Sequence, residues 1–89
     1  MTEEIEKEEG EEDKKKLAML LVYWVEHNKE HARDFKRWAE KARAFGERGV
    51  YEAIMGAVEH TGVVNEYLLK AFELISNNQE QRNEDTDMR

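Results

Sequence analysis

Apolar residues recur at alternating steps of four and three along the middle of the chain. The large or buried-type positions are Leu17, Leu21, Trp24, Asn28, His31, Phe35, Trp38, Ala42 and Phe45. A repeat of 3.5 residues is the contact stripe, or seam, of packed helices, and no strand-like alternation competes with it. Since neither proline nor glycine interrupts residues 13–45, we expect one helix over this range.

A second seam with the same spacing follows a single break. The break is Gly46-Glu47-Arg48-Gly49, and Gly46 stands where the end of a helix favours positive φ. The second seam predicts a helix over 50–76, and its positions are Val50, Ile54, Ala57, Thr61, Val64, Leu68, Ala71 and Ile75. A turn as short as 46–49 implies an antiparallel hairpin, with His31 near Val64. Gly56 and Gly62 lie off the seam, and each indicates the close approach of another backbone.

Charge is concentrated at the ends of the chain. Residues 1–13 hold eight acidic residues and one lysine, which matches the formal net charge of −7 for the whole chain. We predict an acidic disordered tail over 1–12 and a polar disordered tail over 78–89, so that the hairpin occupies 13–77. The tails either keep the protein soluble or engage a basic partner.

The composition argues against several classes of protein. The chain has no cysteine, so it can form neither a disulfide nor a thiolate metal site. It has no apolar run near the roughly 20 residues that span a bilayer and it starts with acidic residues, so we expect a cytoplasmic protein without membrane contact. Basic and acidic residues alternate over 29–48 and the pI is about 5.0, so we expect no nucleic-acid partner. No catalytic triad, phosphate-binding loop or pair of carboxylates with raised pKa is visible, so we expect no enzyme.

Two helices cannot cover the apolar surface of this chain. Further apolar residues lie beside or off the seams: Leu20, Tyr23, Val25, Tyr51, Val58, Val63, Tyr67, Leu69, Phe72 and Leu74. A small chain without disulfides often solves this problem by self-association, and a two-fold dimer of hairpins is a four-helix bundle. We therefore expect an all-α homodimer, with a monomeric hairpin as the alternative. The expected packing residues are Leu17, Leu21, Trp24, Phe35, Trp38, Ile54, Val64, Leu68 and Phe72.

The segment 24–31 is the part of the chain that could carry chemistry. His27 and His31 are one helical turn apart, which is half of a site for zinc, nickel or cobalt, and Glu26 and Glu30 could add oxygen ligands or orient the imidazoles. In a second interpretation, Asn28 and His31 form a polar layer in the seam that fixes register and oligomeric state. A third is a ligand-binding or proton-linked role for the same residues. We expect no other cofactor.

The same segment carries a resemblance. The run Trp24-Val25-Glu26-His27-Asn28-Lys29-Glu30-His31-Ala32 resembles the W-x-E-H-N-x-x-H-A motif of a group of short archaeal and bacterial proteins without a settled activity. The resemblance covers residues 17–75. It implies a helical hairpin in which Glu26, His27, Asn28 and His31 matter as a unit.

These observations lead to two functional hypotheses of different classes. The first is a non-enzymatic, self-associating interaction or scaffold module, whose partner is a second copy or another protein. The alternative is a small protein that binds a divalent transition metal through His27 and His31.

Overall fold

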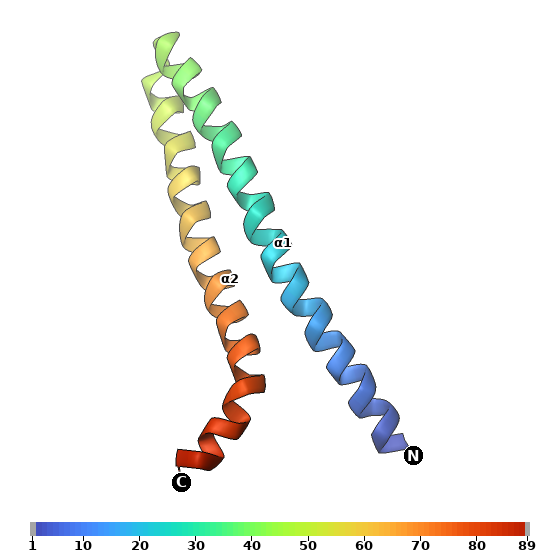
Figure 1. The fold of residues 1–89 in the computed structure, drawn as a ribbon. Coiled ribbons are helices and arrows are strands. Elements are labelled where there is room, and N and C mark those ends of the chain that lie inside the picture. Colours follow the sequence, from blue (N-terminus) through green and yellow to red (C-terminus); the bar gives the residue numbers. More distant parts are fainter. Residues whose placement is uncertain (1, 89) are drawn as a thin grey trace.

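Two long helices run antiparallel from one tight turn in the computed structural model (Figure 1). Helix α1 spans Thr2–Ala44 and helix α2 spans Arg48–Met88. The structure describes the backbone of residues 2–88 and the side chains of residues 10–77. Within 2–88 only residues 45–47 lie outside a helix, so the prediction of an all-α chain of two helices is confirmed.

The bounds of the helices differ from the predicted ones. The predicted helices 13–45 and 50–76 lie almost entirely within α1 and α2, but α2 already begins at Arg48. It begins there because the Tyr51 N–H donates to the Glu47 carbonyl at 3.0 Å, which closes a first helical turn that already includes Gly49. The predicted tails, 1–12 and 78–89, lie mostly outside the residues whose side chains are described. Helix α1 starts within the first of these segments, at Thr2, and helix α2 ends within the second, at Met88.

Gly46 ends α1 in the left-handed conformation that the sequence predicts, with φ at 91°. The Gly46 N–H donates to the Arg43 carbonyl at 3.0 Å, and the Glu47 N–H donates to the Ala42 carbonyl at 2.9 Å. These two bonds form a Schellman motif, which satisfies carbonyls that the end of a helix otherwise leaves unpaired. The same motif turns the chain directly into α2, and this places the two helices side by side.

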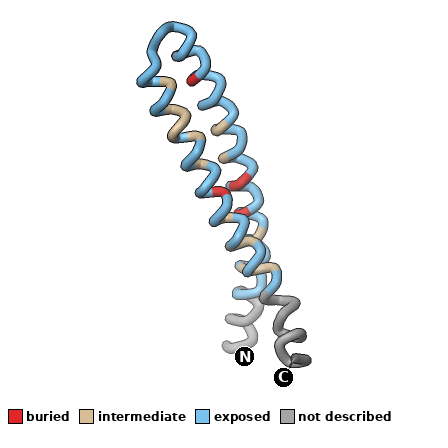
Figure 2. Tube along the Cα trace, turned by 90° about the vertical axis from the view of Figure 1, so that its left-hand side faces the viewer, coloured by how far each residue is buried: buried red, intermediate tan, exposed pale blue. Residues whose placement is uncertain are grey.

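The helices contact each other along a stripe that is only half of each predicted seam. The apolar side chains buried in the described hairpin are Leu21, Val25, Ala39 and Ala42, each at most 5% exposed (Figure 2). Together with the half-buried Ala18, Asn28 and Ala32, these residues form the contact stripe of α1. The stripe keeps some positions of the predicted seam, but at the others it uses the next residue along the chain in place of Leu17, Trp24, His31 and Trp38. On α2 the shift is the same, since Tyr51, Val58, Asn65 and Phe72 are more covered than Val50, Ala57 and Val64.

This shift changes the environment of the predicted packing residues. Leu21 is buried, and Ile54, Leu68 and Phe72 are half-buried. The others are 36% to 53% exposed in the single hairpin, so the neighbouring helix covers them only in part: Leu17, Trp24, Phe35, Trp38 and Val64. Small side chains such as Ala39 occupy the contact instead, since they let two helices approach more closely than tryptophan does.

Two helical glycines are also not explained by the hairpin. A Cβ atom added at Gly56 or at Gly62 would meet no heavy atom within 4 Å. The prediction that another backbone approaches them is therefore wrong for the part of the chain that the structure describes.

We predict that Gly46→Ala lowers the free energy of unfolding by about 1–2 kcal/mol, because alanine pays that cost in the left-handed region. Gly62→Ala is the matched control. Gly62 lies in an exposed helical position, so the same substitution there should raise stability by up to about 1 kcal/mol. Urea unfolding of both variants at one protein concentration measures the difference. Equal effects of the two substitutions would contradict the role of Gly46 as the helix stop.

Candidate functional site

The hairpin is flat, with extents of 65 × 31 × 14 Å, so it presents two broad faces. One of them, the charged face, carries a glutamate at every seventh position of α2 together with basic and acidic residues of α1. Its ion pairs include Lys29 with Glu26 at 3.5 Å and Arg43 with Glu40 at 2.8 Å. All four side chains are about half exposed or more, so these pairs add little stability and mark a solvated surface. The glutamates are Glu52, Glu59, Glu66 and Glu73.

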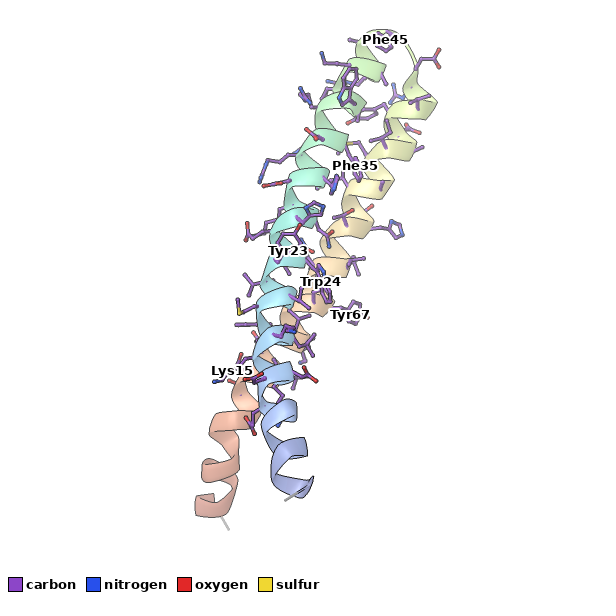
Figure 3. The ribbon with its side chains drawn as sticks, turned by 90° about the vertical axis from the view of Figure 1, so that its right-hand side faces the viewer. Lys15, Tyr23, Trp24, Phe35, Phe45 and Tyr67 are labelled. Carbon is purple, nitrogen blue, oxygen red and sulfur yellow. The ribbon has the colours of Figure 1, made fainter. Side chains whose placement is uncertain are left out.

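The opposite surface, which we call the apolar face, consists of the seam residues that the hairpin leaves uncovered. They are Leu17, Trp24, His31 and Trp38 of α1, Phe45 just beyond its end, and Val50, Ala57 and Val64 of α2, continued by the half-buried Ala71. Trp24 and Phe35 stand out from α1 and Tyr67 from α2 (Figure 3). A groove of about 420 Å³ lies on this face between the helices, and its lining is His31, Asp34, Phe35, Trp38, Ile54 and Ala57.

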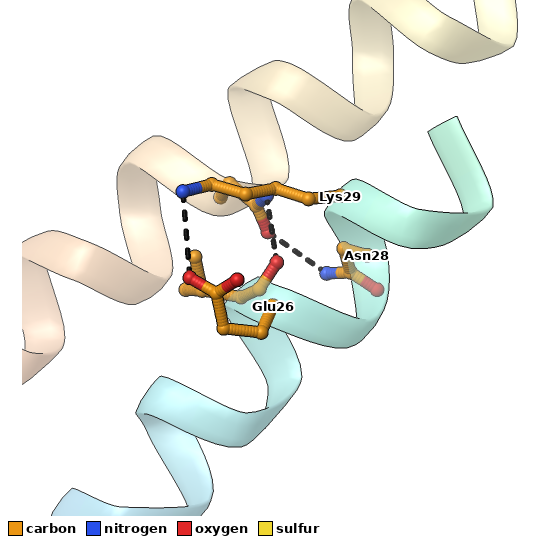
Figure 4. A network of polar contacts seen from close by, with 5 residues as sticks. Glu26, Asn28 and Lys29 are labelled. Carbon is orange, nitrogen blue, oxygen red and sulfur yellow. Dashed lines mark hydrogen bonds and ion pairs between the residues drawn. The ribbon is translucent and has the colours of Figure 1, made fainter. Parts of the chain in front are cut away.

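A polar pair joins the two helices near the middle of the hairpin. The Asn28 Nδ2 donates to the Asn65 Oδ1 at 3.0 Å, and the Asn65 Nδ2 donates to the Val25 carbonyl at 3.2 Å (Figure 4). Asn65 is only 8% exposed, and no buried side-chain nitrogen or oxygen among the described residues lacks a partner. The pair therefore fixes the register of α1 against α2, because sliding one helix by one turn would leave both amides unpaired in an apolar contact.

His27 and His31 point their imidazoles at each other on the exposed side of α1. Their Nε2 atoms are 3.1 Å apart. The two rings belong to a ladder of four aromatic rings, in which neighbouring centroids from Tyr23 through His27 and His31 to Phe35 are 5.5, 4.5 and 6.0 Å apart. The structure thus separates Asn28, which lies between the helices, from His31, which lies on the apolar face.

The two carboxylates of the segment do not join the histidines. Glu26 lies on the charged face with Lys29, and no three His, Asp or Glu side chains within residues 10–77 cluster closely enough to hold a metal ion. The third histidine, His60, has its Nδ1 2.8 Å from the Gly56 carbonyl of its own helix. A single hairpin therefore offers a cation two imidazoles side by side and no third ligand from its described residues.

Asn65 is the site residue that the sequence analysis missed. It stands one position beyond the predicted seam residue Val64, and antiparallel pairing places it opposite Asn28. A search for a polar residue opposite the polar seam position Asn28 would have found it. Val25 and Ala39 do not follow from the predicted seam, because their larger neighbours Trp24 and Trp38 fit the same apolar repeat.

The observations so far define the class of the protein: an antiparallel hairpin of two helices with one apolar and one charged face. The chain belongs to the family DUF8180, described as a domain of unknown function, whose sequence profile matches residues 17–75. No curated protein and no solved structure matches the chain. Neither helix contains, over its described residues, a stretch long and apolar enough to cross a membrane. The family match covers the hairpin with its polar pair and its histidines.

We predict that Asn65→Ala lowers the free energy of unfolding by about 1–3 kcal/mol, because it leaves the Asn28 amide without its partner in a half-buried place. The double variant Asn28→Leu with Asn65→Leu should be at least as stable as the unsubstituted chain, because it removes both amides. Urea unfolding measures both. Asn77→Ala, at an exposed position of α2, is the matched control, and an Asn65→Ala variant no less stable than this control would refute the prediction.

Proposed function

We propose that the protein is a non-enzymatic, self-associating helical module, in which two hairpins pair through their apolar faces to form a four-helix bundle. The observation that carries this proposal is the uneven division of apolar side chains. Four are buried in the described hairpin, whereas Trp38 is 53% exposed and Phe45 is 72% exposed on the apolar face. Full burial of such a side chain is worth about 1.5–3 kcal/mol, which is a strong drive to cover this face.

The charge distribution favours the apolar face over the charged face as the contact. Covering the charged face would remove four glutamates of α2 from water, and burying a carboxylate without a partner is costly. The rows of the apolar face contain no Asp, Glu, Lys or Arg. Beside them, Asp34 lines the groove, 3.2 Å from Arg37, and the Lys41 Nζ lies 4.9 Å from the centroid of the Trp38 ring. The contact therefore buries mainly apolar groups, and the charges beside Trp38 are an ion pair and a lysine that lies over the ring.

A second copy is the occupant that best fits this face. A two-fold dimer brings the same patch of each copy together, so one apolar face covers the other with no further partner. The heptad spacing also continues unbroken across the face, from Leu17 to Trp38 on α1, as the core of a four-helix bundle requires. The groove beside Ala57 and Ile54 offers room for a large side chain of the partner.

We predict that the chain sediments at twice its mass of 10.6 kDa at micromolar concentration and that Trp38→Glu raises the dimer dissociation constant at least about tenfold, a change of about 1.4 kcal/mol. The reason is that a carboxylate in the covered core would be desolvated without a partner.

The matched control is Met19→Glu, because Met19 is 72% exposed and lines a separate groove with Val22 and Tyr23 that shares no residue with the groove beside Trp38. This variant should dimerise like the unsubstituted chain. Sedimentation equilibrium measures all three proteins, and circular dichroism checks that they remain helical. A chain that stays monomeric and folded throughout this concentration range would overturn the proposal, and equal weakening by both variants would show that the contact does not use the apolar face.

A further inference from the structure

We infer that two copies of the chain together form a binding site for a borderline divalent cation, such as Zn²⁺, Ni²⁺ or Co²⁺, from His27 and His31 of each copy. The inference rests on the proposed dimer, because one chain supplies only half of the ligands. The site would lie in the middle of the apolar face, where the two faces meet. Its effect would be to make association of the hairpins depend on the cation.

The first support is the geometry of the two imidazoles. In a tetrahedral site with metal–nitrogen distances of about 2.0–2.1 Å, two ligand nitrogens lie roughly 3.3–3.4 Å apart. The Nε2 atoms of His27 and His31 are 3.1 Å apart and already face each other, so a small opening of the pair would admit a cation. Tyr23 and Phe35 stack on the outer sides of the two rings and help to hold them in this orientation.

The second support is that the pair is incomplete in one chain. No third His, Asp or Glu completes it within residues 10–77, and His60 is engaged with the backbone of α2. Two imidazoles leave two positions of a tetrahedral cation open. A second pair of the same kind would fill both, and imidazole is a ligand that these cations prefer.

The third support is the place of His31 along the hairpin. On the apolar face it has Leu17 and Trp24 on one side and Trp38 and Phe45 on the other, at equal steps of seven residues. In one kind of dimer the two-fold axis runs across the helices, in the plane between the two apolar faces. The two faces then overlap over their whole length only when the axis passes near His31. With the axis along the helices, every residue lies level with its own copy. Only the first arrangement sets α1 against α1 of the other copy, because in the second each α1 faces the second helix of the other copy. The shared site therefore requires the two-fold axis to run across the helices near His31.

Burial of this layer gives the cation a physical role. When the apolar face is covered, His27 and His31 lose contact with water, and an imidazole nitrogen without a partner is costly in an apolar core. A cation held by four imidazoles would occupy all four facing nitrogens at once. By linkage, a ligand that binds only the dimer strengthens dimerisation.

The experiment titrates the full 89-residue chain, freed of metal, with Zn²⁺ and follows sedimentation equilibrium and isothermal titration calorimetry. We expect one Zn²⁺ per two chains. The dimer dissociation constant should fall about 100-fold once free Zn²⁺ exceeds its own dissociation constant about 100-fold. Both effects should be lost in His27→Ala and in His31→Ala and should persist in His60→Ala.

The metal-free dissociation constant of each variant is measured first, so that only the change caused by Zn²⁺ is compared. This separates ligation from any packing effect of His31→Ala. One Zn²⁺ per chain that is lost in His27→Ala would mean that each hairpin binds its own cation. Binding that survives His27→Ala would place the cation elsewhere, for example on the acidic residues 1–12. Either result overturns the inference.

The outcomes separate this inference from the proposed dimer. A metal-free dimer that ignores Zn²⁺ overturns the metal site and leaves self-association standing. A metal-free monomer that Zn²⁺ converts to a dimer through His27 and His31 supports the metal site and overturns unaided association. A chain that is monomeric with and without Zn²⁺ overturns both.

Discussion

The constraint on which this structure depends is the narrowness of the contact between two helices. Each helix can hide only the residues that point at its neighbour, and in this hairpin they form one stripe per helix. The apolar residues of the chain occupy a wider sector than that stripe. Leu21 and Val25 fit into the contact, whereas Trp24 lies on its edge and Trp38 lies outside it. Both the open apolar face and the drive to cover it follow from this mismatch in width.

The division by size within the seam follows from the same constraint. Close helices need small side chains between them, and Ala39 and Ala42 supply these near the turn. The aromatic rings cannot enter without pushing the helices apart, so they lie on the face that a third or fourth helix could cover. In a bundle each helix has two neighbours, and a sector that is too wide for one contact is then the right width.

The sequence predicts the helices and their turn well, because both follow from local chemistry. The uninterrupted run from Asp13 to Phe45 and the positive φ of Gly46 each depend on residues within a few positions. Which side of each helix makes the contact does not depend on neighbouring residues in the sequence alone. A 3.5-residue repeat defines a stripe two residues wide, and Leu17 or Ala18 could equally lie on its inner edge. Only the presence of α2 decides between them, and it favours the alanine because of its size.

The residues of the candidate site are likewise separated by the contact between the two helices. Asn28 and His31 stand in one seam in the sequence, but in the hairpin Asn28 pairs with Asn65 between the helices while His31 lies on the open face. The two roles depend on each other. Because the amide pair fixes α1 against α2 lengthwise, it also fixes Ala57 beside Trp38 and keeps open the groove that His31 borders. A polar residue inside the hairpin thus determines the shape of the surface outside it. A slip of one helical turn would place a different set of side chains beside Trp38, and two copies of the face would then have to fit each other in a different register.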